Sequence, residues 1–323
     1  MSQNKSDNLK QIRRKQRISS ILSVFCKVLL VFLILLSLYL YNFIARDHVP
    51  PLIDQTENTV LSSAVVHYID VGQADAACIV LNSGETVLID AGSNASEDKL
   101  LSYLSKYGIH RIDYAVFSHP HEDHIGGADA IFDSCIVENV ILPDAVSTGS
   151  TYDILLEKIA AEDCTVNKAR VGDTYTLGDA SFSILGPAGE IDSSNLNNAS
   201  ILLRFVCGNT SFLFTGDAEY TAESAALQIL DTSAFSSTVI KIGHHGSSTS
   251  SSDAFLSAVS PDVAVISCGP QNEYGHPHKE VLDRISSYTD NIFRTDQSGS
   301  IRIHTDGETL VVRCDRGTSD SNP

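Results

Sequence analysis

Four candidate metal ligands lie within six consecutive residues, and this cluster limits what the chain can fold into more than any other feature. The segment FSHPHEDHIGG contains His119, His121, Asp123 and His124. It follows the apolar run YAVFS, which is typical of a buried strand, so we expect the cluster in a loop at a strand end. In such a loop the first two histidines can converge on one ion, while Asp123 and His124 point to a second. Because imidazole and carboxylate ligands suit Zn²⁺ or Mn²⁺, we expect a site for two divalent metal ions.

Strand-like and helix-like segments alternate between residues 63 and 315, which we interpret as one domain. Strand-like runs include AVVHYID, ACIVL and ETVLID near its beginning, and IRIH and LVVRC near its end. Helix-like segments include AESAALQIL, HKEVLDRISSY and SEDKLLSYLSKYG, of which the last begins with a serine cap and ends at a glycine. Strands at both ends with interspersed helices predict an α/β (α+β) domain, with two sheets sandwiched between helices.

An apolar run near the N-terminus predicts a single transmembrane anchor at residues 21–44. Residues 1–20 are basic, so we expect them in the cytoplasm and everything after residue 45 outside the membrane. A cleaved signal peptide is the alternative, although the run is long for one and no A-x-A cleavage site follows it. We expect residues 45–62 to be a linker and residues 316–323 to be a disordered tail.

The net charge of −18 is unevenly distributed along the chain. The first 45 residues hold seven basic residues against Asp7, which leaves 15 basic and 39 acidic residues for the rest, a balance of −24. Nonspecific nucleic-acid binders normally show a basic face, because phosphate neutralisation supplies most of their affinity. No such face is visible in the sequence, although bound divalent metals would cancel some negative charge locally.

Missing motifs argue against several other chemistries. The sequence has no G-x-S-x-G elbow of a serine hydrolase and no G-x-x-x-x-G-K-[ST] phosphate loop. Its cysteines after the apolar run are scattered singly, and no C-x-x-C spacing indicates a zinc ribbon or a redox site. A disulfide pair therefore cannot be named from the sequence.

The H-x-H-x-D-H array resembles the hallmark of the metallo-β-lactamase superfamily. The resemblance extends along almost the whole domain and implies a four-layer αββα sandwich. It implies that Asp217, in FLFTGDAE, bridges the two metal ions. It also implies that Asp90, in LIDAG, orients a metal ligand without binding the metal itself.

Three further blocks are similar to the soluble domain of ComEC-type competence proteins. They are KIGHHGSSTSS, NEYGHPHKEVLDRI and DVGQADA, in which Ala74 stands where the family has glycine. We expect Asp70, the first residue of DVGQADA, to support the site together with Asp90. Phosphorylcholine-esterase relatives share this general arrangement.

One departure from the superfamily pattern concerns the metal ligands. Many members have a ligand histidine between the H-x-H-x-D-H loop and the bridging aspartate, but this chain has no histidine from 125 to 243 and offers SSNLNNAS instead. We expect the pair His244 and His245 to supply the missing ligand; His244 is favoured as the ligand and His245 as the residue facing substrate. His276 then either completes the second metal, transfers a proton or is purely structural.

The resemblance implies hydrolysis of a phosphodiester, with extracellular DNA a possible substrate. Two metal ions would hold a hydroxide between them, Asp123 would orient it, and His245 or His276 would protonate the leaving group. The alternatives are a phosphodiesterase of the cell envelope or of small molecules, for which the acidity suits a cationic substrate, and a non-catalytic accessory protein of DNA uptake. The expected partners are the membrane and the substrate, and no obligate protein partner is evident.

Overall fold

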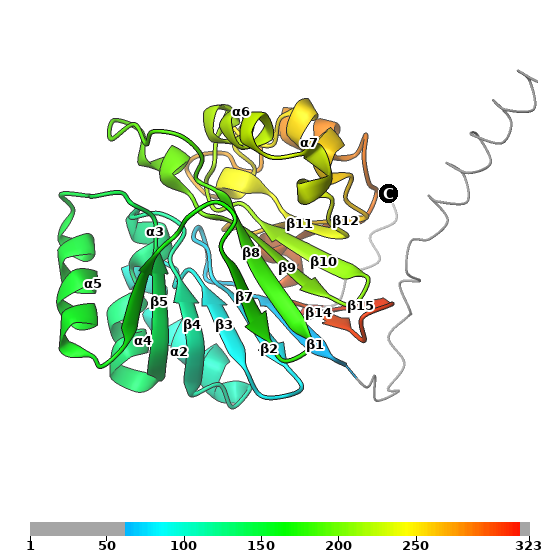
Figure 1. The fold of residues 1–323 in the computed structure, drawn as a ribbon. Helices are drawn as coiled ribbons and strands as arrows, with labels where there is room; N and C mark the ends of the chain where they lie inside the picture. Colours follow the sequence, from blue (N-terminus) through cyan, green and yellow to red (C-terminus); the bar gives the residue numbers. More distant parts are fainter. Residues whose placement is uncertain (1–61, 317–323) are drawn as a thin grey trace, which may run out of the picture. The chain divides into compact units, whose positions relative to one another are not determined.

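The computed structural model describes residues 62–316, which form two β-sheets with helices on their outer faces (Figure 1). The chain divides into two units, Met1–Pro50 and Pro51–Pro323, and all described residues belong to the second. The expected basic segment (1–20), anchor (21–44), most of the linker and nearly all of the tail lie outside the described residues. Within residues 62–316, no helix combines the length and the apolar character needed to cross a membrane.

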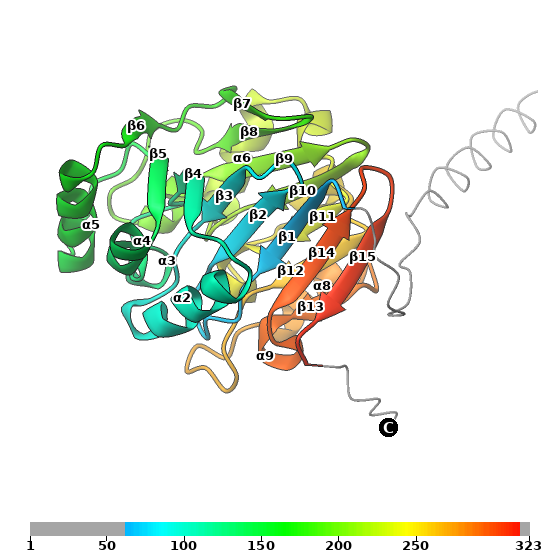
Figure 2. The same ribbon diagram turned by 90° about the horizontal axis from the view of Figure 1, so that it is seen from below.

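The larger sheet has eight strands in the order β15-β14-β1-β2-β3-β4-β5-β6, which Figure 2 shows from its outer side. Its strands are β1 (Ala64–Tyr68), β2 (Ala77–Leu81), β3 (Thr86–Ile89), β4 (Arg111–Val116), β5 (Ile136–Leu142), β6 (Thr165–Lys168), β14 (Ile301–Thr305) and β15 (Leu310–Cys314). The smaller sheet has seven strands in the order β13-β12-β11-β10-β9-β8-β7. These are β7 (Thr174–Leu177), β8 (Ala180–Gly186), β9 (Leu202–Cys207), β10 (Thr210–Phe214), β11 (Val239–Lys241), β12 (Val263–Ile266) and β13 (Ile292–Arg294).

Helices cover the outer face of each sheet (Figures 1 and 2). The larger sheet is accompanied by η1 (Asn94–Ser96), α2 (Glu97–Lys106), α3 (Glu122–Ile125), α4 (Ala128–Ser134) and α5 (Ser150–Ala161). The remaining helical elements are η2 (Leu196–Ala199), α6 (Tyr220–Ile229), η3 (Thr232–Phe235), η4 (Gly243–Gly246), α7 (Asp253–Val259), α8 (Lys279–Ile285) and α9 (Thr295–Ser298).

Three apolar cores separate the layers. The central core joins the inner faces of both sheets, as in the contact group that contains Ile79 of β2 and Phe212 of β10. A second core packs α2, α4 and α5 against the larger sheet, and a third packs α6, α7 and α8 against the smaller sheet. Two sheets between helices is the architecture that the alternating segments predicted.

The termini of α2 show how local sequence sets an element. Glu97 and Asp98 lie in its first turn and Lys106 in its last, which complements the helix dipole. Gly108 follows with a φ of +68°, a left-handed conformation that glycine adopts without strain and that commonly ends a helix. The serine-capped, glycine-terminated pattern in the sequence therefore predicted this helix.

The direction of the strands places several loops at one edge of the sandwich. Strands β3 to β6 run parallel, as do β10 to β13, so their carboxyl ends meet at one edge of each sheet. Strands β1 and β3 are both antiparallel to β2 and so point in the same direction, which brings the loop after β1 to the same edge. The loop before β9 does so as well, since β9 is antiparallel to β10. Ligand sites in open α/β sheets form outside such carboxyl ends.

Candidate metal centre

The H-x-H-x-D-H segment begins in the loop at the carboxyl end of β4, which holds His119 and His121, and ends in the short helix α3, which holds Asp123 and His124. Two glycines let this loop pack closely against the segment after β3. A Cβ on Gly126 would lie 2.2 Å from the backbone nitrogen of Asn94, and one on Gly127 would lie 2.4 Å from the carbonyl oxygen of Ala91. Any larger residue would therefore push the loop away from β3 and from the residues that support it.

A first cluster of ring nitrogens consists of His119, His121 and His244. The Nε2 atom of His119 lies 3.0 Å from Nδ1 of His121. The Oδ2 atom of Asp217, which directly follows the Thr215–Gly216 turn after β10, lies 4.0 Å from His119 Nε2 and 3.7 Å from His244 Nε2. These nitrogens thus converge on one oxygen of the carboxylate.

A second cluster consists of Asp123, His124 and His245. The Nε2 atom of His124 lies 3.2 Å from the other oxygen of Asp217, Oδ1. The Nε2 atom of His245 lies 3.2 Å from Asp123 Oδ2 and 3.7 Å from Asp217 Oδ2. The carboxylate of Asp217 therefore stands between the two clusters, which is the position of a bridging ligand in a site for two ions.

Hydrogen bonds on the far side of each ring set its orientation. His124 Nδ1 lies 2.7 Å from Asp90 Oδ2, and His245 Nδ1 lies 3.0 Å from the carbonyl oxygen of Ser267. The backbone N–H and the hydroxyl of Ser118 donate to the same Asp90 carboxylate, at 2.6 and 2.8 Å. Asp90 thus contacts the rear nitrogen of His124, and this contact leaves Nε2 of His124 facing Asp217.

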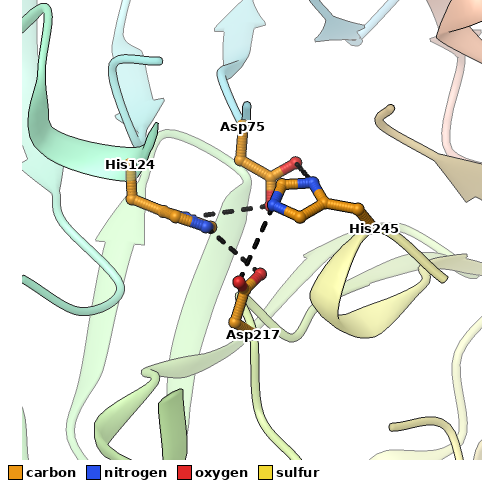
Figure 3. A group of neighbouring side chains, drawn as sticks. All are labelled: Asp75, His124, Asp217 and His245. Atoms are coloured by element: carbon orange, nitrogen blue, oxygen red, sulfur yellow. Dashed lines mark ion pairs between the residues drawn. The ribbon is translucent and has the colours of Figure 1, made fainter. Parts of the chain in front are cut away.

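Asp75 lies behind the two rings of the second cluster (Figure 3), and it forms a buried ion pair with Lys241. The carboxylate of Asp75 lies 3.8 Å from Nδ1 of His124 and 3.7 Å from Nδ1 of His245. The ligand atoms of Asp75, His124, Asp217 and His245 all lie within 4.8 Å of one another. Because Asp75 faces the Nδ1 sides and Asp217 the Nε2 sides, we interpret Asp217 as the ligand and Asp75 as an orienting charge.

The two histidines of η4 owe their directions to unusual backbone angles. His244 has φ +51° and His245 has φ +53°, which is the left-handed region that is costly for residues with a Cβ. Gly246 follows with φ +84°, and a Cβ there would lie 2.5 Å from Cβ of Pro277. The strained turn aims two neighbouring histidines at different clusters, which an ordinary helical turn or strand would not do.

The charges of the second cluster are strongly coupled. Burial acts to raise the pKa of Asp217, but the charges of His124 and His245 hold it well below its usual value. Burial acts to lower the pKa of His124, but Asp217 and Asp90 raise it well above its usual value. Burial likewise opposes the charge of Lys241, whereas Asp75 and Asp217 raise its pKa. A metal ion would replace the proton of His124 as the positive partner of Asp217.

The two remaining predicted residues lie in different places. His276 lines a cavity of about 200 Å³ beside both clusters, and its buried Nδ1 has no hydrogen-bond partner among the described residues. Burial, followed by the charge of His245, lowers the pKa of His276 to about 4. Asp70, in contrast, pairs with Arg316 at 2.7 Å in a separate and larger cavity of about 540 Å³. The contacts thus give the supporting position to Asp75 rather than to Asp70, because the loop after β1 turns between them.

Sequence reasoning missed several residues that build the site. Lys241 carried a usable signal, since a lysine inside the apolar run STVIKIG must find a buried partner. Ser200 carried none: its hydroxyl accepts from the backbone N–H of Asp217 and lies 3.3 Å from His119 Nδ1. Asn197 and Tyr274 also line the cavity and were not singled out. In the described part of the chain all six cysteines are free.

The donor set fits divalent metal ions. His124 Nε2 and Asp217 Oδ1 are both buried, yet neither makes a hydrogen bond of acceptable geometry. Buried polar atoms without partners are costly, and two of them facing each other are satisfied by a cation between them. Imidazole nitrogens with carboxylate oxygens are the donors that such ions take in proteins.

The sequence profile of the metallo-β-lactamase superfamily matches residues 69–161. Two curated relatives match most of the chain: ComE operon protein 3 of Bacillus subtilis is 29% identical over 75% of this chain and 33% of its own length. Recombination protein 2 of Haemophilus influenzae is 33% identical over 77% of this chain and 30% of its own. The chain therefore spans about a third of the length of these relatives.

Among solved structures, CmlA, a diiron β-hydroxylase from Streptomyces venezuelae, aligns with a TM-score of 0.50. The alignment covers 76% of this chain and 55% of that chain at 15% identity, so it supports the fold alone. Together with the two clusters that share Asp217, these matches lead to one conclusion. The chain belongs to the metallo-β-lactamase superfamily, with an enzyme-type fold and a site of the dinuclear kind, and it resembles the corresponding domain of ComEC-type competence proteins.

Proposed function

We propose that the chain is a metal-dependent phosphodiesterase that acts outside the membrane, with DNA as the first substrate to test. The observation that carries the proposal is the pair of ligand clusters that share Asp217 beside a cavity of about 200 Å³. Divalent ions held there would supply Lewis acidity and lower the pKa of a water molecule. We propose Zn²⁺ or Mn²⁺, because the donors combine imidazole with carboxylate.

The residues of the chain would position the reacting groups. Oδ1 of Asp217 faces His124, and its Oδ2 faces the first cluster and also His245. This carboxylate would therefore hold the two ion positions at a set separation. Asp123 lines the cavity, and its Oδ2 lies 3.2 Å from Nε2 of His245. From this place its carboxylate would accept a hydrogen bond from the attacking water molecule and orient it toward the substrate.

His276 is the candidate for proton transfer to the leaving group. Both ring nitrogens of His245 are engaged, one by the carbonyl of Ser267 and the other by Asp123. His276 instead presents an unpartnered Nδ1, and its backbone N–H donates to Asn272 Oδ1 at 2.9 Å, which holds the loop in place. A ring that is fixed by its backbone and free at one nitrogen can exchange a proton with a bound substrate.

The names of the relatives make DNA the first substrate to test. One matched protein is called recombination protein 2, and another, from Neisseria gonorrhoeae, is called competence protein ComA. The balance of −24 after residue 45 disfavours tight electrostatic binding of a polyanion, so we expect weak DNA affinity that depends on the bound ions.

An ester of phosphorylcholine is the second candidate substrate. Tyr274 is 60% exposed at the cavity rim, and its ring stacks on His276 with a centroid distance of 5.6 Å. An aromatic face beside the carboxylates of Asp123 and Asp217 suits a quaternary ammonium group. A non-catalytic role in DNA uptake is less favoured, because it gives no reason for two complete ligand clusters.

The membrane location is a proposal that rests on the sequence. The apolar run at residues 21–44 follows a basic segment, so we propose a single-pass anchor with the catalytic domain outside the cytoplasm. Protease added to intact cells should then digest the domain after residue 45. Protection in intact cells, with digestion only after lysis, would reverse this orientation.

Activity of the full-length chain tests the proposed function. Loaded with Mn²⁺ or Zn²⁺, it should cleave single-stranded DNA and bis-p-nitrophenyl phosphate, and a chelator should abolish cleavage. Asp217→Asn should lower the rate by about a hundredfold or more, because both clusters share this carboxylate. Asp179→Asn, an exposed aspartate in the turn before β8, should keep the parent rate. Cleavage of p-nitrophenyl phosphorylcholine alone would select the second candidate, and bound metal without any turnover would favour the non-catalytic role.

A further inference from the structure

Asn197 presents a buried oxygen at the cavity beside the first cluster. It lies in η2, in the loop before β9, and lines the cavity together with His121, Asp217 and His244. Its Oδ1 atom is buried and has no hydrogen-bond partner among the described residues. Asp217 Oδ1 and His276 Nδ1, which belong to the same cavity, share this property. A buried acceptor without a partner in the wall of this cavity indicates that a ligand contacts it.

The neighbouring Glu219 determines which end of the amide is free. Asn197 Nδ2 donates to Oε1 of Glu219 at 3.4 Å, and a carboxylate can only accept, so the amide nitrogen must face it. Asn195 Nδ2 and Thr249 Oγ1 also donate to Glu219, at 2.7 and 2.9 Å, which holds the carboxylate in place. The free polar atom of Asn197 is therefore the acceptor Oδ1, and it suits a cation or a hydrogen-bond donor.

The other polar side chains of the loop are already engaged. Asn198 Oδ1 accepts from the backbone N–H groups of Glu219 and Ala222, both at 3.2 Å, and so caps the start of α6. Asn195 Oδ1 accepts from the backbone N–H of Asn197 at 3.2 Å. Ser200 Oγ accepts from the backbone N–H of Asp217 at 2.9 Å. Within residues 193–200, Asn197 alone combines an unused acceptor with a place in the cavity wall.

We propose that Asn197 Oδ1 is a further metal ligand at the first cluster, where many superfamily members have a histidine. A carboxamide oxygen is a harder donor than an imidazole nitrogen, and it suits Mn²⁺ better than Zn²⁺. The substitution of oxygen for nitrogen therefore shifts the preference of the first cluster toward Mn²⁺. The proposal rests on the metal site of the proposed function but not on its substrate.

Metal titrations of the full-length chain test this ligand without substrate. Mn²⁺ binding to the chelator-treated protein is followed by electron paramagnetic resonance, and Zn²⁺ binding by calorimetry. Asn197→Ala should weaken the binding of one of two Mn²⁺ ions by about tenfold or more, because one ligand is lost. Asn197→His should raise the affinity for Zn²⁺ relative to Mn²⁺ by a similar factor. Asn198→Ala removes a neighbouring amide and should leave both affinities unchanged.

Two results would overturn the proposal. The first is an Asn197→Ala variant that binds Mn²⁺ as tightly as the parent chain does. The oxygen would then not be a metal ligand; a higher KM would show that it contacts substrate instead. The second is an equal loss in Asn197→Ala and Asn198→Ala, which would trace the effect to the loop fold; thermal unfolding of both metal-free variants verifies that each is folded. Absence of phosphodiesterase activity would sink the proposed function but would leave these titrations interpretable.

Discussion

The two ligand clusters share one carboxylate but are supported in different ways. His124 and His245, in the second cluster, are 0% and 2% exposed, and charged groups or a carbonyl contact the far side of each ring. In the first cluster His121 and His244 are partly exposed at the cavity. The rear nitrogen of His119 there meets the hydroxyls of Ser118 and Ser200, at 3.1 and 3.3 Å.

Because of this difference, we expect the second cluster to affect the stability of the fold and the first cluster to affect which metal ion binds. The second cluster contains buried carboxylates that need positive partners, so its substitution leaves uncompensated charge in the interior. In the first cluster His119 and His244 also face carboxylates, but two of its three rings are partly exposed at the cavity. Substitution in the first cluster should therefore change which ion binds while the fold stays intact. Four predictions test this contrast between the clusters.

The largest expected effect concerns the ion pair behind the second cluster. Lys241→Met should lower the free energy of unfolding by about 3–5 kcal/mol, because it leaves Asp75 buried without its ammonium partner. Denaturant unfolding in the presence of chelator measures the change. Adding Asp75→Asn to the variant should recover part of the loss, and Lys99→Met, at an exposed site on α2, is the control. A loss below about 1 kcal/mol in Lys241→Met would mean that the pair is not important for stability.

The next effect compares one histidine from each cluster. In the metal-free protein, His124→Ala should cost about 2–3 kcal/mol, because Asp90 loses a buried hydrogen-bonding partner and Asp217 loses a buried ion-pair partner. His121→Ala should cost less than about 1 kcal/mol, since its ring is partly exposed. Paired unfolding curves measure both values, and equal costs would refute the contrast.

The third effect concerns metal occupancy at η4. His244→Ala and His245→Ala should each reduce bound metal from about two ions to one per chain, since the two rings face different clusters. Elemental analysis after dialysis measures the occupancy. Ser200→Ala and Asn198→Ala should keep two ions, although loss of the Ser200 contact to His119 could weaken affinity up to about tenfold. Full occupancy in both histidine variants would place the missing ligand in the loop before β9 alone.

The smallest effect distinguishes the two aspartates of DVGQADA. Asp70→Asn removes an exposed ion pair with Arg316 and should change stability by less than about 1 kcal/mol, with no change in bound metal. Asp75→Asn should weaken metal binding measurably, because Asp75 faces both rings of the second cluster. Metal loss in Asp70→Asn would restore the supporting role that the sequence first suggested for it.

Much of the fold could be predicted because its interior strands are apolar and several helices begin or end at residues that favour helix termini. The sequence reasoning assigned no element between residues 128 and 177, where α4, β5, α5, β6 and β7 occur. Strands β6 and β7 lie at the edges of their sheets and are largely exposed, so their polar residues lack the apolar pattern of interior strands. Their position comes from pairing with a neighbour rather than from local preference.

The candidate site also has a part that the local sequence predicted and a part that only the tertiary structure decided. The local motif alone predicted the cluster of His119, His121, Asp123 and His124, because four candidate ligands at a strand end have no packing explanation. The expected loop holds the first two, whereas Asp123 and His124 lie in α3. The resemblance implied Asp217 and the histidine pair of η4, and the tertiary structure shows how they face the motif. It also chose Asp75 over Asp70, a choice between residues five positions apart that depends on the course of an irregular loop.

The amino-acid sequence by itself therefore determined the chemistry of the ligands and the strand ends that carry them. Only the tertiary structure decided which charges face each other. Asp123 meets His245 across 122 positions of the chain, and Asp75, in the loop between β1 and β2 of the larger sheet, meets Lys241 of β11 in the smaller one. Buried charges are stable only when paired, and each of these pairs forms where the two sheets come together. Periodicity and motif spacing report on single elements, so they cannot identify partners that two different sheets supply.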